Sequence, residues 1–251
     1  KAQVSVSIWA AGSLAEPLAA ARVDLAERSI ELNILCGPSG SLRNEIEAGA
    51  RPDIFLSAAP SHAMRLLEIG LAHDVRHLCQ NRIVALVGPR ANPQFDLVDL
   101  LTDRKLRIAT STPKADPSGD YAHLLLEHVS RRSADTAQLP KREVLILAGT
   151  PAAPKAPPGT SHYGWILSKD MADVFLTYAS NALHAIAAYS YLRIVEPPQE
   201  LRILADFFGA QLDTGGDTLI VWDYLTTNAF QARLVEKGFT IGPTQPTELP
   251  Q

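Results

Sequence analysis

Short apolar strands alternate with helical segments along the first part of this chain, and this alternation constrains the fold more than any other feature. Residues 4–10 (VSVSIWA), 30–36 (IELNILC) and 53–58 (DIFLSA) are typical of buried strands, and helical segments at 13–28 and 41–49 separate them. Repeated strand–helix units predict a parallel sheet with helices on both faces. The predicted fold class is therefore α/β.

The same alternation resumes in the second part of the chain. Further strands are predicted at 81–89, 105–110, 142–147, 172–179 and 190–198, helices at 60–70, 118–132 and 162–171, and a helical segment at 217–239 with a break at 226–228. The segment 148–161 is rich in proline and glycine and is expected to be a loop. No flexible linker separates the parts, so strands are expected to join two lobes.

Length and charge narrow the function classes. The 251 residues are enough for two lobes of about 100–150 residues. A net charge of −4 disfavours nucleic acid and acidic membrane surfaces as partners, so any bound anion must be attracted locally. No apolar run is long enough to span a membrane. Cys36 and Cys79 lack metal-ligand spacing and are expected to be free thiols.

Serines stand at two predicted junctions between a strand and a helix. Ser13 follows Gly12 in AAGSLAEP, and Ser39 lies within CGPSGS. Taken alone, Ser13 is well placed to cap the helix, with Glu16 completing a capping box, and Ser39 is similar. The alternative is that both serines contact a ligand.

Two such helix ends beside hydroxyl groups suit a compact anion. A helix N-terminus leaves N–H groups unpaired and carries a partial positive charge. PSGDY at 117–121 forms a third junction, and LTYASNA at 176–182 ends a strand with a tyrosine. Open α/β sheets bind ligands at the carboxyl ends of their strands. Two junctions in each half would allow two lobes to close over one fully ionised oxyanion.

Enzymatic chemistry has little support in the sequence. A serine hydrolase acting through Ser13 or Ser39 needs a histidine base, and neither junction has one nearby in the sequence. The nucleophile elbow and the Walker A loop are absent, and no acidic, histidine or cysteine residues have the spacing of a catalytic or preformed metal site. The chain is therefore not expected to be an enzyme.

Several blocks of the sequence resemble the periplasmic molybdate-binding proteins of ABC importers. They are VSIWAAGSLAEPLAA, PSGSLRNEIEAGARPDIFLSA, NRIVALVGP, PKADPSGDYA, ADVFLTYASNA and the terminal KGFTI, in that order over most of the chain. The resemblance implies the two-lobed periplasmic-binding-protein fold of type II, with each lobe a mainly parallel sheet flanked by helices. It also implies that molybdate or tungstate is bound as the ligand by hydrogen bonds alone, without a cofactor.

The resemblance assigns site residues position by position. Ser13 and Ser39 match two serines that donate both a hydroxyl and a backbone N–H. Ser118 matches a backbone N–H donor, Tyr178 a hydroxyl donor, and Thr160 lies near the expected fifth donor. Asp116 departs from the family pattern, and either caps the helix that begins near Ser118 or coordinates the metal directly, as in an archaeal branch. The cap is preferred, because a carboxylate facing a dianion is costly.

The resemblance also implies an organisation and a setting. Lobe one is expected at 1–82 and 195–251 and lobe two at 83–194, with hinge strands near 82–88 and 190–196. The protein is expected to be a periplasmic monomer whose signal peptide has been removed, and to deliver its ligand to a membrane permease. The alternatives are another small oxyanion such as sulfate or phosphate, or a ligand-sensing effector domain, although the helix-turn-helix of a full-length regulator does not precede the first strand.

Overall fold

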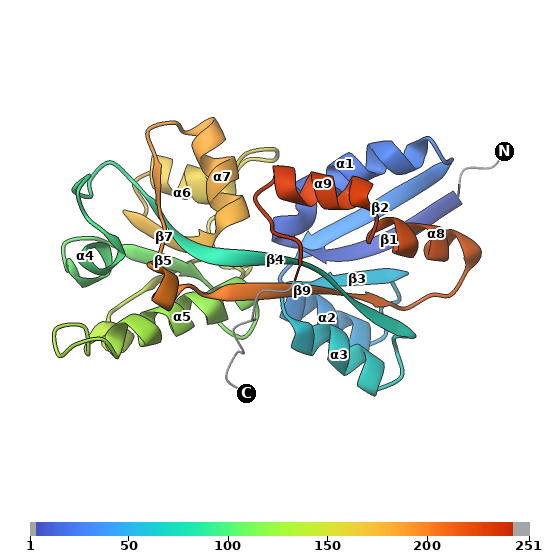
Figure 1. Ribbon diagram of the computed structural model, residues 1–251, viewed down its shortest axis with the longest axis horizontal. Coiled ribbons are helices and arrows are strands. Elements are labelled where there is room, and N and C mark those ends of the chain that lie inside the picture. The colour runs from blue at the N-terminus through green and yellow to red at the C-terminus, as the bar shows by residue number, and fades with distance from the viewer. Residues whose placement is uncertain (1–3, 243–251) are drawn as a thin grey trace. The chain divides into compact units, whose positions relative to one another are not determined.

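The computed structural model describes residues 4–242, which form two compact units (Figure 1). Unit one runs to Asn81 and resumes at Ala205, and unit two is Arg82–Leu204. The chain passes from one unit to the other within β4 (Asp74–Val87) and at the start of β9 (Leu204–Gln211). The predicted second boundary at residue 195 falls inside unit two. The second crossing strand is therefore β9 rather than the segment 190–196.

Unit one is a sheet with helices on both faces. Its further elements are β1 (Val4–Ala11), η1 (Gly12–Leu14), α1 (Ala15–Ala26), β2 (Ile30–Gly37), α2 (Ser39–Glu47), β3 (Ile54–Ser57), α3 (Pro60–Glu68), α8 (Gly216–Tyr224) and α9 (Asn228–Glu236). The strand order is β2-β1-β3-β9, with β9 antiparallel to β3. Helices α1 and α9 cover one face, and α2 and α3 cover the other (Figure 1).

Apolar side chains explain this arrangement. Ile8 of β1 and Phe55 of β3 have no solvent exposure, and Phe55 packs with Ile46 of α2 and Leu66 of α3. β1 pairs with both β2 and β3 in parallel, so the carboxyl ends of all three strands lie at one edge of the sheet. The helices that follow β1, β2 and β3 consequently start at that edge.

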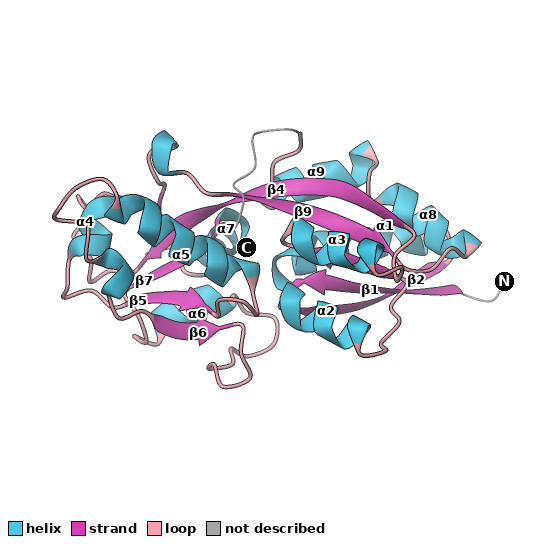
Figure 2. Cartoon of the chain, turned by 90° about the horizontal axis from the view of Figure 1, so that it is seen from below, coloured by secondary structure: helices cyan, strands magenta, loops and turns pink. Residues whose placement is uncertain are grey.

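Unit two is built in the same way. Its elements are α4 (Leu97–Thr102), β5 (Ile108–Ser111), α5 (Pro117–Ser130), η2 (Leu139–Lys141), β6 (Leu145–Ala148), α6 (His162–Ser168), β7 (Val174–Tyr178), α7 (Ala179–Ala188), β8 (Arg193–Val195) and η3 (Gln199–Leu201). The strand order is β4-β7-β5-β6, and β8 also pairs with β4. Helix α5 lies on one face of this sheet, and α6 and α7 lie on the other (Figure 2).

The predicted alternation of strands and helices is confirmed, and so is the break between α8 and α9. Among residues 4–242, the elements α4, α7 and β9 and the short turns η2 and η3 were not predicted. The strand predicted at 190–198 is reduced to the three residues of β8. The segment 149–161 between β6 and α6 is a loop, as its proline content indicated, and both cysteine thiols are free.

Asp173 joins β5 to β7 at the start of both strands. Its carboxylate accepts hydrogen bonds from the Arg107 backbone N–H at 2.7 Å and from the Arg107 side-chain Nε at 3.0 Å. The side chain of Asp173 is 2% exposed. Burial acts to raise the pKa of Asp173, but the Arg107 hydrogen bonds and charge outweigh it, so the pKa is lowered overall. The carboxylate therefore stabilises unit two in its ionised form.

Replacement of this carboxylate should weaken unit two. We expect Asp173→Ala to lower the free energy of unfolding by about 2–3 kcal/mol, since it removes hydrogen bonds to a charged group, and urea titration at neutral pH measures this. Because the pKa of Asp173 is lower in the folded state, its carboxylate contributes fully to the free energy of unfolding above the ordinary pKa of about 3.9. This contribution is lost as the pH falls through the folded-state pKa. The difference in free energy of unfolding between wild type and variant should therefore become smaller below about pH 4. Equal stability at pH 7 would contradict this role.

Candidate functional site

The two serine junctions of unit one lie side by side. In the register of β1 with β2, Ala11 pairs with Gly37. Ser13 lies two residues after Ala11, and Ser39 lies two residues after Gly37. The end of β3 joins them, because Ser39 Oγ accepts a hydrogen bond from the Ala58 N–H at 3.0 Å. Three strand ends therefore bring Ser13 and Ser39 to one edge of the sheet.

Ser13 does not cap a helix, which corrects the capping-box expectation. The turn η1 separates β1 from α1, so the N-cap position of α1 falls to Leu14, and no side chain makes a capping hydrogen bond there. The Ser13 hydroxyl is nevertheless buried, and it has no hydrogen-bond partner among the described residues. A buried polar group without a partner costs about 1–3 kcal/mol, so this hydroxyl needs an explanation other than capping.

Ser39 is not a cap either. Pro38 occupies the N-cap position of α2, and Ser39 is the first residue of the helix with 1% exposure. Its hydroxyl oxygen accepts from Ala58, and a hydroxyl that accepts still has its own O–H to donate. Ser39 can therefore donate to a ligand while it ties α2 to the end of β3.

A cation that sequence reasoning missed lies one turn after Ser39. Arg43 is on the same face of α2, four residues on. Its Nη1 and Nη2 atoms donate to Glu47 and Asn44, while its Nε atom is buried without a hydrogen-bond partner among the described residues. Burial and, to a smaller extent, the charge of nearby Arg43 lower the pKa of His62 to about 4, so His62 is neutral at pH 7. Arg43 was hidden because LRNEIE has the composition of a solvated helix face.

In unit two, the start of α5 lies at the carboxyl end of β5. Asp116 is the N-cap residue, as preferred from the sequence, and its Oδ1 accepts from the Ser118 N–H at 3.1 Å. The resemblance implied this N–H as a ligand donor, but Asp116 occupies it. The Ser118 side chain provides another donor, because it is 1% exposed and its Oγ has no partner within the described part of the chain.

Two glycines allow this junction to close tightly. A Cβ at Gly119 would lie 2.5 Å from the Ser111 carbonyl oxygen, so α5 begins in direct contact with the backbone that follows β5. Gly149 follows β6 with a φ of +77°, and a Cβ there would lie 2.4 Å from Ser111 Oγ. Only glycine is compatible with these two positions.

Tyr178 and Thr160 differ in their surroundings. Tyr178 ends β7, is 2% exposed, and has a raised pKa, chiefly because of burial and then because of the Asp116 charge. β7 runs parallel to β5, so its end lies at the same edge as Ser118. Thr160 is exposed, and both its N–H and its hydroxyl donate to the Pro157 carbonyl oxygen within the loop.

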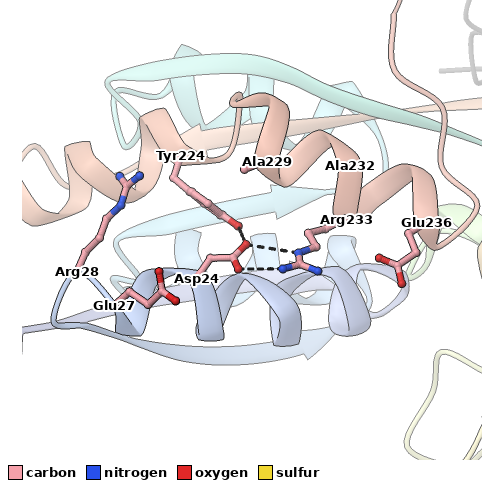
Figure 3. A pocket seen from close by; sticks show the side chains of 8 residues that line it. All are labelled: Asp24, Glu27, Arg28, Tyr224, Ala229, Ala232, Arg233 and Glu236. Carbon is pink, nitrogen blue, oxygen red and sulfur yellow. Dashed lines mark hydrogen bonds and ion pairs between the residues drawn. The ribbon is translucent and has the colours of Figure 1, made fainter.

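An open groove of about 410 Å³ lies elsewhere in unit one, between α1 and the helices α8 and α9 (Figure 3). Its centre is Asp24, which accepts hydrogen bonds from Tyr224 Oη at 2.5 Å and from Arg233 Nη2 at 3.0 Å. These bonds lower the pKa of Asp24. The groove holds none of the predicted site residues, and its acidic groups do not favour an anion.

Two kinds of feature are absent from residues 4–242. No three histidine, cysteine or acidic residues in this range are grouped so that they could hold a metal ion. Within the same range, no helix is both long enough and apolar enough to cross a bilayer.

Solved structures share the fold of this chain at low sequence identity. The periplasmic molybdate-binding protein of Azotobacter vinelandii matches with a TM-score of 0.74 and 16% identity over 95% of this chain and all of that one. The sulfate-binding protein SubI of Mycobacterium tuberculosis matches with a TM-score of 0.76 and 16% identity, over 96% of this chain and 88% of that one. The substrate-binding domain of a putative molybdenum ABC transporter from Clostridium difficile matches with a TM-score of 0.67 and 20% identity, over 96% of this chain and all of that one.

These likenesses confirm the periplasmic-binding-protein fold. The model of one protein family, described as bacterial extracellular solute-binding protein, matches residues 6–240, which is nearly the whole chain. The family and the structural neighbours are binding proteins rather than enzymes. The chain therefore belongs to the bacterial extracellular solute-binding proteins.

Proposed function

We propose that this protein captures molybdate or tungstate outside the cytoplasm and delivers it to an ABC importer. The observation that carries the proposal is a pair of buried hydroxyls that have no hydrogen-bond partner among residues 4–242, Ser13 in unit one and Ser118 in unit two. Each stands at the carboxyl ends of parallel strands, and each was assigned as a ligand contact from the sequence. Buried donors without partners indicate that a ligand supplies the acceptors.

The donor set suits a tetrahedral oxyanion. Ser13, Ser39 and Ser118 provide neutral O–H donors, and the first turn of α2 adds the partial positive charge of a helix N-terminus. We propose Tyr178, at the end of β7, as a further O–H donor. Thr160 is proposed only as a weak additional donor, because its own loop holds both of its donor groups.

Other properties follow from the family and the resemblance. The solute-binding family supports an extracytoplasmic location, which we propose to be the periplasm, and a membrane permease as partner. We propose a monomer that needs no cofactor, with the oxyanion held by hydrogen bonds and the metal four-coordinate. Asp116, which caps α5, is then not a metal ligand.

Sulfate is the second candidate ligand. The likeness to the sulfate-binding protein of Mycobacterium tuberculosis has a TM-score of 0.76, similar to that of the molybdate-binding protein. Neutral donors also suit sulfate, so the fold alone does not discriminate between them. The sequence blocks around Ser13 and Ser39 favour molybdate.

A thermal-shift titration separates these ligands. Molybdate or tungstate at about 100 times its dissociation constant should add about 2.7 kcal/mol to the free energy of unfolding. Sulfate and phosphate at the same concentration should add much less, because the sequence blocks around Ser13 and Ser39 resemble those of molybdate-binding proteins. Equal stabilisation by sulfate and molybdate would favour the second candidate.

Single serine variants test the proposed donors. Ser13→Ala and Ser118→Ala should each weaken molybdate binding by about 10-fold to 100-fold, since a hydrogen bond to a charged group is worth about 1.5–3 kcal/mol. Each should leave the unliganded protein as stable or up to about 1 kcal/mol more stable, because a buried hydroxyl without a partner is removed. Calorimetric affinity and urea unfolding of the same variants measure both effects.

Two other serines separate the effects on affinity and on stability, and Ser7 is the matched control. Ser39→Ala should lose affinity and also about 1 kcal/mol of stability, because the Ala58 N–H loses its acceptor. Ser7→Ala should lose stability but not affinity, since the Ser7 hydroxyl donates to Asp53 within the fold. Parental affinity in both Ser13→Ala and Ser118→Ala would show that the ligand binds elsewhere.

A further inference from the structure

Asp116 brings an acidic group into the part of unit two where an anion is proposed to bind. It keeps partial solvent exposure, whereas Pro117, Ser118 and Gly119, which follow it, are buried. Its Oδ1 atom lies 3.1 Å from the Ser118 N. A ligand oxygen that accepts from Ser118 Oγ would lie about 3 Å from that hydroxyl, and therefore beside the same residue whose backbone N–H the carboxyl holds.

The carboxyl of Asp116 is surrounded by neutral or acidic groups. Oδ2 accepts from Ser111 Oγ at 2.6 Å, and Oδ1 accepts from the Ser118 N–H. The titratable groups that face it are Asp120 on α5, Tyr163 on α6 and Tyr178 at the end of β7. Lys114 and His123 act on Asp120 rather than on Asp116. Within the described residues, no cation therefore compensates an ionised Asp116.

These surroundings already favour the neutral carboxylic acid. Burial raises the pKa of Asp116, and the Asp120 charge raises it further, while the hydrogen bonds from Ser111 and Ser118 offset only part of this. A dianion at the Ser118 hydroxyl would add a second like charge next to the carboxyl. A dianion that stays fully ionised therefore favours the protonated form of Asp116, because a nearby like charge disfavours the charged carboxylate.

We propose that Asp116 is protonated in the oxyanion complex, so that this carboxyl enters the site as a neutral hydrogen-bonding group and makes uptake of a fully ionised anion depend on pH. The inference rests on the proposed function and deepens it. The proton comes from solvent and is held on a carboxyl oxygen, where its O–H donates to the ligand or to the Ser111 hydroxyl. Asp116 is then a specificity-determining residue, because it admits an anion without adding a negative charge to the site.

Infrared difference spectroscopy tests the protonation state directly. The molybdate complexes of the wild type and of Asp116→Asn are compared at about pH 7, where molybdate itself stays fully ionised. We expect the wild type alone to show the carbonyl stretch of a carboxylic acid, which shifts in D₂O. Asp120→Asn is the comparison variant: it removes a neighbouring charge that raises the pKa of Asp116, and it should still keep this band, because the bound dianion continues to favour the protonated carboxyl. A wild-type complex without the band, with Asp116 ionised, overturns the inference.

The pH dependence of affinity provides the second readout. Asp116→Asn keeps a capping oxygen and carries no charge, so its affinity for molybdate should be independent of pH. Wild-type affinity should match it within a few-fold at low pH, and should fall about tenfold per pH unit once the unliganded carboxyl ionises. Ser111→Ala removes a donor to the carboxylate, which raises its pKa, and should move this fall to higher pH.

Two further outcomes separate this inference from the proposed function. If Asp116→Asn abolishes binding at every pH while wild-type binding is tight and independent of pH, then Asp116 acts as an ionised ligand, and only this inference fails. If Asp116→Asn does not fold, the Ser111→Ala shift and the infrared band of the wild type decide the question. If the wild type binds neither molybdate, tungstate nor sulfate at any pH, the proposed function fails, and this inference fails with it.

Discussion

Parallel strand pairing is the constraint on which the candidate site depends. The pairing of β1 with β2 and β3 places three strand ends at one edge, and the pairing of β5 with β6 and β7 does the same in unit two. The segment after each end must turn away from the sheet, and helices follow most of these turns. Polar groups in such turns either satisfy one another, as Ser39 and Ala58 do, or stay available, as the Ser13 hydroxyl does. A ligand site formed in this way is a consequence of the topology.

Much of the fold could be predicted because the strands that position the site are local and strongly apolar. Buried runs such as IFLS are recognisable without knowledge of their partners, and glycine or proline marks their ends. The role of Ser13 was harder to predict. Its spacing from Glu16 fits a capping box, but the short turn η1 moves the helix start two residues onward. Capping depends on backbone angles that residue types only partly determine.

The elements that were missed depend on contacts distant in sequence. Asp206 interrupts the apolar pattern of β9, but it accepts hydrogen bonds from Gln80 Nε2 at 3.0 Å and lies 2.9 Å from His77 Nε2. These two partners satisfy the hydrogen-bonding capacity of the buried Asp206 carboxyl. Without them, a buried acid in this segment would disfavour a strand. The close approach of Gly119 to the Ser111 backbone is similar, since the sequence offers only the motif PSGDY. Packing distances of this kind become visible only when both segments are placed.

Neutral donors alone give a site little means to distinguish one dianion from another except by size. The structural neighbours illustrate this, because one fold carries proteins named for molybdate and for sulfate at the same 16% identity to this chain. An acidic residue at the edge of the proposed site adds charge as a second basis for selection. An ionised Asp116 opposes every dianion through its charge, whereas a protonated Asp116 adds a donor whose position is fixed by Ser111 and by the start of α5. Asp116 therefore bears on the charge of the proposed site, and discrimination by size is left to the proposed serine donors.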